Sequence, residues 1–289
     1  MTVGSGDAAA SAESPARPTA RSLARSLTAL GLEPGGVVLV HASLRGAGGT
    51  RARTMLDALL RALGPRGTLV APSFTPENSD SSAAHRARVA GLTPREAAAV
   101  RGAMPPFDPA STPAPGMGVL SEALRVRAGA VRSAHPQTSF VAYGPAGGAV
   151  TAGHRADCHL GERSPLAALY RARARVLLLG VGFDVCSAFH LAEYRVPDPP
   201  RRTYRCVVRR GGRRSWWSYE DVALDDSDFT LLGAAYEAGG TTRTGTVSGL
   251  RCRLLDLQDA VDFAARWMPA NRPRRTGTGD SGHKGGGIT

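Results

Sequence analysis

Three short, mainly apolar runs constrain the fold of this 289-residue chain more than any other feature. Residues 37–40, 68–72 and 175–181 are rich in Val and Leu, and each is short enough for a buried strand. Strands that are apolar on both sides need cover on both faces of their sheet, which is typical of sheets that are at least partly parallel. The runs therefore predict an α/β protein.

The segments between and after these runs carry the spacing of helices or of antiparallel strands. Leu23, Leu27 and Leu30 share one helical face, and Asp256 is placed to cap a later helix. We expect one three-layer α/β/α domain with a central mixed sheet and an antiparallel extension. Further apolar helical spacing covers residues 55–63 and 257–267, and antiparallel strands are expected at residues 203–218 and 241–254.

The two ends of the chain differ in composition from its centre. Residues 1–20 are rich in Ala, Ser, Pro and Gly, and residues 271–289 form a basic, glycine-rich tail, so we expect both to be disordered around a domain at 21–270. No apolar run approaches the roughly 18–20 residues of a membrane span, and the start does not resemble a secretory signal. The sequence thus predicts a cytoplasmic protein without a membrane partner and with four free cysteines.

The formal net charge of +12 favours an anionic partner. The candidates are nucleic acid and a phosphate-bearing small molecule. The arginines are dispersed, and no helix carries a one-sided basic stripe with interleaved aromatic residues. We therefore expect no nucleic acid and favour the phosphate-bearing molecule.

The segment after the third apolar run carries the sharpest chemical signal. The glycines at 180 and 182 allow a tight exit from the strand. If residues 186–194 are helical, Ser187, His190 and Glu193 follow each other at three-residue spacing on one face. A carboxylate beside an imidazole suits a general base. Spacing alone leaves open a half-buried histidine with a purely structural role.

A second candidate segment runs from proline-rich residues into Gly116-Met117-Gly118. Glycines leave the backbone unobstructed at a helix start, and the free N–H groups there suit a pyrophosphate. An ordinary flexible loop explains the same pattern. His154, Cys158 and His159 have a superficial zinc spacing but lack a second ligand pair, so we expect no metal.

Familiar motifs exclude several enzyme classes. The chain has no G-x-x-x-x-G-K-[ST] phosphate loop and no G-x-S-x-G nucleophile elbow, which argues against a serine hydrolase built on His190. Histone-acetyltransferase-like enzymes carry the motif R/Q-x-x-G-x-G/A. The nearest match here, residues 45–50, ends in Thr instead of Gly or Ala, which argues against that superfamily.

Six short motifs follow one another in a fixed order along residues 21–270. The motifs are Val-His41-Ala-Ser43-Leu; Gly67-Thr-Leu-Val-Ala-Pro-Ser-Phe74; Pro106-Phe-Asp108-Pro with Thr112-Pro113 and Met117-Gly118; Arg132-Ser-x-His135-Pro136 with Ser139-Phe140; Leu160-Gly161 with Ser164-Pro165-Leu166; and Leu179-Gly-Val-Gly182 with Phe189-His190-Leu-Ala-Glu193-Tyr194. Together, over residues 21–270, they resemble the aminoglycoside 3-N-acetyltransferase family, in particular its actinobacterial branch.

The resemblance implies transfer of an acetyl group from acetyl-CoA to the 3-amino group of a 2-deoxystreptamine ring, on a fold distinct from the histone-acetyltransferase-like one. The amine of a different antibiotic or metabolite is the alternative, and a homodimer is left open. We expect direct transfer with His190 as base, Cys186 being a buried thiol rather than a nucleophile. The expected residues are His190, Glu193 and Ser187 for catalysis; His41, Ser43, Ser73, Thr112, Met117 and Gly118 for coenzyme A; and Asp80, Asp157, Glu162 and Asp198 for the cationic substrate, with Glu193 shared between substrate and base.

Overall fold

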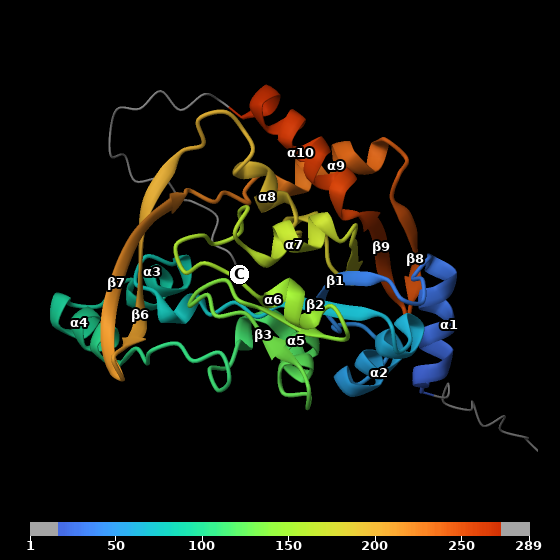
Figure 1. Cartoon of the computed structure of the whole chain (residues 1–289), viewed down its shortest axis with the longest axis horizontal. Helices are drawn as coiled ribbons and strands as arrows, with labels where there is room; N and C mark the ends of the chain where they lie inside the picture. Colours follow the sequence, from blue (N-terminus) through green and yellow to red (C-terminus); the bar gives the residue numbers. More distant parts are fainter. Residues whose placement is uncertain (1–16, 273–289) are drawn as a thin grey trace, which may run out of the picture.

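A seven-stranded sheet forms the centre of the computed structural model, which describes residues 17–272 (Figure 1). Strand β1 (Val37–Ala42) lies in the middle and pairs in parallel with β2 (Thr68–Pro72) and with β5 (Arg175–Leu179). These three strands are the apolar runs recognised in the sequence. Their carboxyl ends therefore meet at one edge of the sheet.

Antiparallel strands extend the parallel centre on both sides, in the order β3-β4-β2-β1-β5-β9-β8. The sheet is thus mixed, as expected, and its antiparallel strands lie at both edges rather than at one. The added strands are β3 (Val131–Arg132), β4 (Phe140–Tyr143), β8 (Arg243–Val247) and β9 (Leu250–Asp256).

Helices cover both faces of the sheet, which confirms the three-layer architecture. Side chains alternate along β1: Val38 and Val40 face one core, and Leu39 faces the other. One layer contains α1 (Ala20–Leu30), α2 (Ala52–Leu63) and α5 (Gly118–Arg125). The other contains α6 (Gly147–Thr151), α7 (Pro165–Arg171), α8 (Phe189–Glu193), α9 (Phe229–Ala238) and α10 (Leu257–Asn271).

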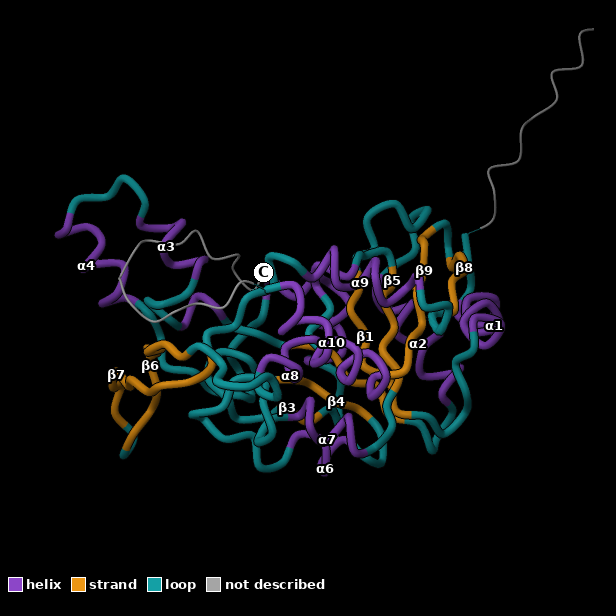
Figure 2. The backbone as a smooth tube through the Cα atoms, turned by 90° about the horizontal axis from the view of Figure 1, so that it is seen from above, coloured by secondary structure: helices purple, strands orange, loops and turns teal. Residues whose placement is uncertain are grey.

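The strands expected at 203–218 do not join the central sheet. They form a separate hairpin of β6 (Arg201–Arg210) and β7 (Arg213–Val222), whose turn residues Gly211 and Gly212 both have positive φ angles. Figures 1 and 2 show this hairpin at one end of the molecule, with β8 and α1 at the other. Beside the hairpin lie α3 (Ala83–Val89) and α4 (Pro94–Ala103), and short 3₁₀ turns occur at η1 (Pro76–Asn78), η2 (Pro115–Met117) and η3 (Phe183–Val185).

Local signals explain where the terminal helices begin and end. The Thr19 and Ser22 side chains form a capping box at the start of α1, and the Asp256 carboxylate accepts from Asp259 N at the start of α10, as expected. The domain extends past the expected boundary at 270, because Arg272 is half-buried and makes ion pairs with the body. The rest of both end segments, residues 1–16 and 273–289, lies outside the described residues.

Candidate active site

The parallel strands end beside one another because glycine permits their close approach. Ser43 N, just after β1, donates to Leu179 O at the end of β5 over 2.9 Å. Gly180 follows with a φ of +67°, and a Cβ on it would lie 2.5 Å from Ser43 O. A larger residue at 180 would therefore force the two strand ends apart.

A cavity of about 700 Å³ opens at this junction of strand ends and the start of α5. Carboxyl ends of parallel strands are the usual place for ligand sites in such sheets. Six of the residues expected from the sequence line this cavity: His41, Ser43, Met117, Gly118, Ser187 and His190.

His190 is held by Glu193 one turn later on α8. His190 Nδ1 lies 2.7 Å from Glu193 Oε2, and both side chains are buried. A carboxylate accepts from the protonated ring nitrogen, so the neutral tautomer keeps its lone pair on Nε2. The Phe229 ring packs 4.7 Å from the imidazole, centroid to centroid. Backbone position, carboxylate and aromatic ring together fix the plane of the imidazole.

The second carboxylate oxygen of Glu193 is also engaged. Oε1 accepts from Asp225 N over 3.0 Å and from Arg272 Nη1 over 2.6 Å. Glu193 does not line the cavity. The expectation that Glu193 is shared between substrate and base therefore finds no geometric support, because both of its oxygens already face protein donors.

His41, from β1, differs from His190 in having no carboxylate partner. Burial, together with the nearby His190, lowers the pKa of His41 to about 3. Its Nε2 is buried and has no hydrogen-bond partner among the described residues. His41 therefore brings a neutral imidazole to the cavity wall.

Two carboxylates line the cavity, and neither was among the substrate contacts expected from the sequence. Asp184 follows β5, and Asp226 lies in the irregular segment between β7 and α9. Burial raises the pKa of Asp226, and the neighbouring His190 acts in the opposite direction. No periodicity or motif marks Asp226, so only the folded chain shows its place beside the histidine.

The four carboxylates expected to bind the substrate lie away from the cavity. Asp80 pairs with Arg205, Asp157 with Arg155, and Glu162 with Arg195. Asp198 is exposed, with a φ of +47°. None of the four appears among the cavity-lining residues: Asp80, Asp157, Glu162, Asp198.

Ser73 and Thr112 also lie outside the cavity lining. Their backbone carbonyls both accept from the guanidinium of Arg132. The Thr112 hydroxyl accepts from Asp108 N over 2.9 Å. Arg132 thus joins the end of β2 to the loop that contains Thr112. That loop leads into α5, whose first residues line the cavity.

Cys186 is fully buried between η3 and α8 and does not line the cavity. Burial raises the pKa of its thiol to about 12. A thiolate is the reactive form of cysteine, and this raised pKa favours the protonated thiol at neutral pH.

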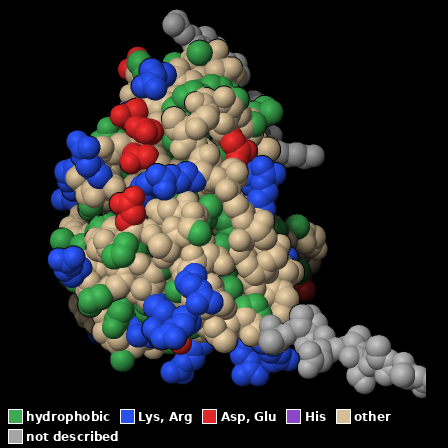
Figure 3. All heavy atoms as spheres, turned by 90° about the vertical axis from the view of Figure 1, so that its right-hand side faces the viewer, with side chains coloured by type: hydrophobic (Ala, Val, Ile, Leu, Met, Phe, Trp, Pro, Cys, Tyr) green, Lys and Arg blue, Asp and Glu red, His purple; other side chains and the backbone are tan. Residues whose placement is uncertain are grey.

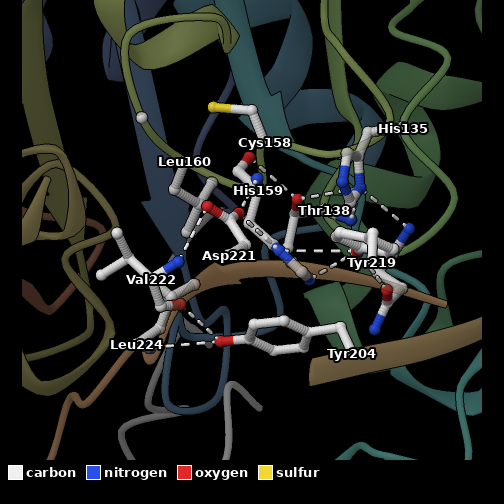
Figure 4. Close-up of polar contacts among 12 residues, drawn as sticks. His135, Thr138, Cys158, His159, Leu160, Tyr204, Tyr219, Asp221, Val222 and Leu224 are labelled. Atoms are coloured by element: carbon white, nitrogen blue, oxygen red, sulfur yellow. Dashed lines mark hydrogen bonds and ion pairs between the residues drawn. The ribbon is translucent and has the colours of Figure 1, made fainter. Parts of the chain in front are cut away.

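A buried polar network joins the hairpin to the body and was not anticipated from the sequence (Figure 4). His159 Nδ1 lies 3.0 Å from Asp221 Oδ2, and its Nε2 lies 3.0 Å from the hydroxyl of Tyr219. Asp221 also accepts from the hydroxyl of Tyr194 over 2.6 Å. Burial lowers the pKa of His159 despite this carboxylate. Asp221 and Tyr219 lie 62 and 60 residues from His159 in the sequence, so their bonds to His159 hold β7 against the loop at 158–164.

Two structural absences concern only the described part of the chain. Within residues 17–272, no helix is long and apolar enough to cross a membrane. Over the same range, no group of three or more His, Cys, Asp or Glu side chains could hold a metal ion. That the protein works without a metal stays a prediction.

The fold and the cavity define an α/β enzyme with its ligand site at the carboxyl ends of parallel strands. The chain belongs to the aminoglycoside 3-N-acetyltransferase family, a family of acyltransferases, whose sequence model matches residues 39–269. Aminoglycoside N(3)-acetyltransferase VII of Streptomyces paromomycinus is 34% identical over 284 residues, covering 89% of this chain and 93% of the relative.

Solved structures share this fold. The aminoglycoside N(3')-acetyltransferase-like protein YokD of Bacillus subtilis is 37% identical over 263 residues, covering 88% of this chain and 93% of YokD. Its crystal structure matches with a TM-score of 0.81 at 36% identity, over 88% of this chain and 94% of that one. A structure of AAC-IIIb in a binary complex with CoASH matches with a TM-score of 0.76 at 30% identity. The match covers 90% of this chain and 99% of that one.

Proposed function

We propose that this enzyme transfers the acetyl group of acetyl-CoA to the 3-amino group of the 2-deoxystreptamine ring of aminoglycosides, by direct transfer with His190 as general base. The observation that carries the proposal is that His190 lines the cavity while its Nδ1 lies 2.7 Å from Glu193 Oε2 behind it. The family and its relatives named for this reaction support the substrate assignment.

The chemistry needs a base because a protonated amine cannot attack a carbonyl. His190 Nε2 takes a proton from the ammonium, the amine nitrogen bonds to the thioester carbon, and the carbon–sulfur bond breaks. The leaving thiolate takes the proton from the imidazolium, and the second proton lost by the nitrogen passes to solvent. Glu193 supports this sequence by holding Nδ1–H and stabilising the imidazolium.

The cavity wall offers groups for the negative charge that develops on the carbonyl oxygen. Ser43, just after β1, and Ser187, just before α8, both line the cavity. Their hydroxyls are our candidates for donors to that oxygen. Direct transfer is further supported by the buried, protonated Cys186, which leaves no activated thiol to form an acyl-enzyme.

Coenzyme A fits the side of the cavity formed by β1 and α5. Gly116 and Gly118 expose backbone at the start of α5, and a Cβ at 116 would meet nothing within 4 Å. Arg45 adds a positive side chain to the lining. Free N–H groups at a helix start together with an arginine suit phosphate oxygens. His41 and Met117 would then lie along the pantetheine arm.

The cationic substrate fits the carboxylates of the cavity. Asp226 and Asp184 line it, and Asp226 lies close enough to His190 for their charges to interact. An ammonium group of the substrate bound at Asp226 would lie near the base. We therefore propose these two carboxylates as the substrate contacts, in place of the four exposed or arginine-paired ones.

The test measures thiol release from acetyl-CoA with a panel of aminoglycosides and of simpler amines. Wild-type enzyme should turn over aminoglycosides carrying a free 3-amino group, and mass spectrometry should place the acetyl group there. His190→Ala should lower kcat by about 10²–10⁴-fold while coenzyme A binding persists.

The matched control is His85→Ala, since His85 is buried on α3 and outside the cavity lining. Near-normal kcat in folded His190→Ala would remove His190 from the mechanism. Turnover of other amines but of no aminoglycoside would reassign the substrate and keep the chemistry. Acetyl label on Cys186 after incubation with acetyl-CoA alone would overturn direct transfer.

A further inference from the structure

We propose that Arg272, which follows the last helix, is a positioning residue for the catalytic base: it holds Glu193 in the orientation that His190 needs. The proposal rests on the proposed function, since it concerns the same histidine. It assigns a role to a residue that the sequence analysis placed in a disordered tail.

The guanidinium of Arg272 is anchored before it reaches Glu193. Its Nε and Nη2 bond to the two carboxylate oxygens of Asp228, each over 2.7 Å, and Nη2 also donates to Asp225 O over 2.8 Å. This fork-to-fork pairing fixes the guanidinium plane. Arg272 N donates to Met268 O over 2.8 Å, so α10 sets where the side chain starts. Only Nη1 is left, and it lies 2.6 Å from Glu193 Oε1.

The contact divides the Glu193 carboxylate between two tasks. Oε1 accepts from Arg272 and from Asp225 N, and Oε2 faces His190. A carboxylate that lacks such donors on one oxygen is free to rotate, and its second oxygen is then no longer held toward its partner. Arg272 therefore fixes the direction in which Oε2 points at the imidazole, and its positive charge lies behind the negative charge of the carboxylate.

The charges around His190 predict which way its protonation responds. Glu193 lies on its own helix, Asp226 precedes α9, His41 lies on β1, and His159 comes from the 158–164 loop. Behind Glu193 lies the positive charge of Arg272, whose pKa its ion pairs raise above the ordinary value although burial opposes this. Removing this charge favours the imidazolium, and neutralising Glu193 disfavours it. The two changes should therefore move the acidic limb of the pH–rate profile in opposite directions.

The experiment compares Arg272→Gln, Arg272→Lys and Glu193→Gln in the full chain. Arg272→Gln should lower kcat by about 10–100-fold, which is the usual loss when a side chain that orients a functional residue is removed. It should also move the acidic limb of the pH–rate profile to higher pH. Glu193→Gln should move it to lower pH. Arg272→Lys keeps the positive charge but loses the two-point contact with Asp228. The acidic limb should therefore stay where it is in the wild type, and kcat should fall less than in Arg272→Gln.

The control is Arg266→Gln, because Arg266 is an exposed residue of the same helix. It should leave kcat and profile unchanged. If Arg272→Gln does not fold, Asp228→Asn releases the anchor of the guanidinium and should shift the limb in the same direction by less. Wild-type kcat and profile in a folded Arg272→Gln enzyme, or in Asp228→Asn if Arg272→Gln cannot be obtained folded, would overturn the proposal.

A readout that needs no substrate separates this proposal from the proposed function. The imidazole of His190 can be titrated by NMR in the free protein. Arg272→Gln should move its titration midpoint upward, and Arg272→Lys should not. If the wild-type enzyme acetylated no aminoglycoside but the midpoint moved, the substrate assignment would fail and the role of Arg272 would stand. If the titration midpoint of His190 did not move in Arg272→Gln, the proposed role of Arg272 would be wrong.

Discussion

At the residue scale, the site contrasts two histidines that line one cavity. His190 has a carboxylate on Nδ1, whereas His41 has a buried Nε2 without a partner among the described residues. The carboxylate orients the ring of His190, whereas burial lowers the pKa of His41 and keeps its imidazole neutral. The difference comes from neighbours rather than from residue type, and it is the reason why we propose only His190 as the base.

Burial of neutral histidines predicts a loss of stability in acid. The folded pKa is about 3 for His41 and about 4 for His154, below the ordinary value of 6.5. The unfolded chain therefore binds protons first, and stability is lost as pH falls below about 6.5. Each unit of lowered pKa corresponds to about 1.4 kcal/mol. The melting temperature should fall steadily from pH 7 to pH 4.

His41→Gln tests the share of one histidine in this acid sensitivity. The variant cannot take up the proton, so its melting temperature should fall less steeply between pH 6.5 and pH 4 than that of the wild type. An identical slope would show that His41 is not held neutral in the folded protein. His135 and His159, whose pKa values burial also lowers, should account for part of the remaining slope.

At the element scale, strand ends bring the site together, and a glycine sets their spacing. Gly180 has a φ of +67° and lies against the backbone of Ser43. Gly180→Ala should therefore cost about 1–3 kcal/mol and lower kcat, because the end of β5 shifts away from β1. Thermal melting and kcat measure both effects. The control is Gly102→Ala, since Gly102 lies within α4 and a Cβ there meets nothing within 4 Å. Equal stability of the two variants would show that the strand ends tolerate separation.

How much of the site was predictable depends on sequence distance. The strands follow from apolar runs, and His190 and Glu193 are three residues apart, so a local pattern was enough to pair them. Their helix is shorter than expected, since α8 spans Phe189–Glu193 and leaves Ser187 before it. Arg272 lies 79 residues from Glu193, and Asp226 lies in an irregular segment. Periodicity carries no information on such contacts, so only the fold shows them.

At the scale of the whole molecule, the positive charge must serve two substrates of opposite sign. The net charge of +12 attracts an anionic coenzyme and repels a cationic antibiotic. On the face shown in Figure 3, basic side chains form several separate groups, with acidic ones among them. On this face the positive charge is therefore spread out, whereas Asp184 and Asp226 place two carboxylates on the wall of one cavity.

This division predicts two separable responses in one enzyme. Added salt screens the long-range field, so the KM for acetyl-CoA should rise with ionic strength. Asp226→Asn removes a short-range contact of a kind worth about 1.5–3 kcal/mol, so the KM for the aminoglycoside should rise about 10–100-fold while that for acetyl-CoA stays the same. The control is Asp157→Asn, because Asp157 lies outside the cavity and pairs with Arg155; it should change neither KM. If the antibiotic KM responded to Asp157→Asn and not to Asp226→Asn, the substrate would bind on the outer loops and the cavity carboxylates would have another role.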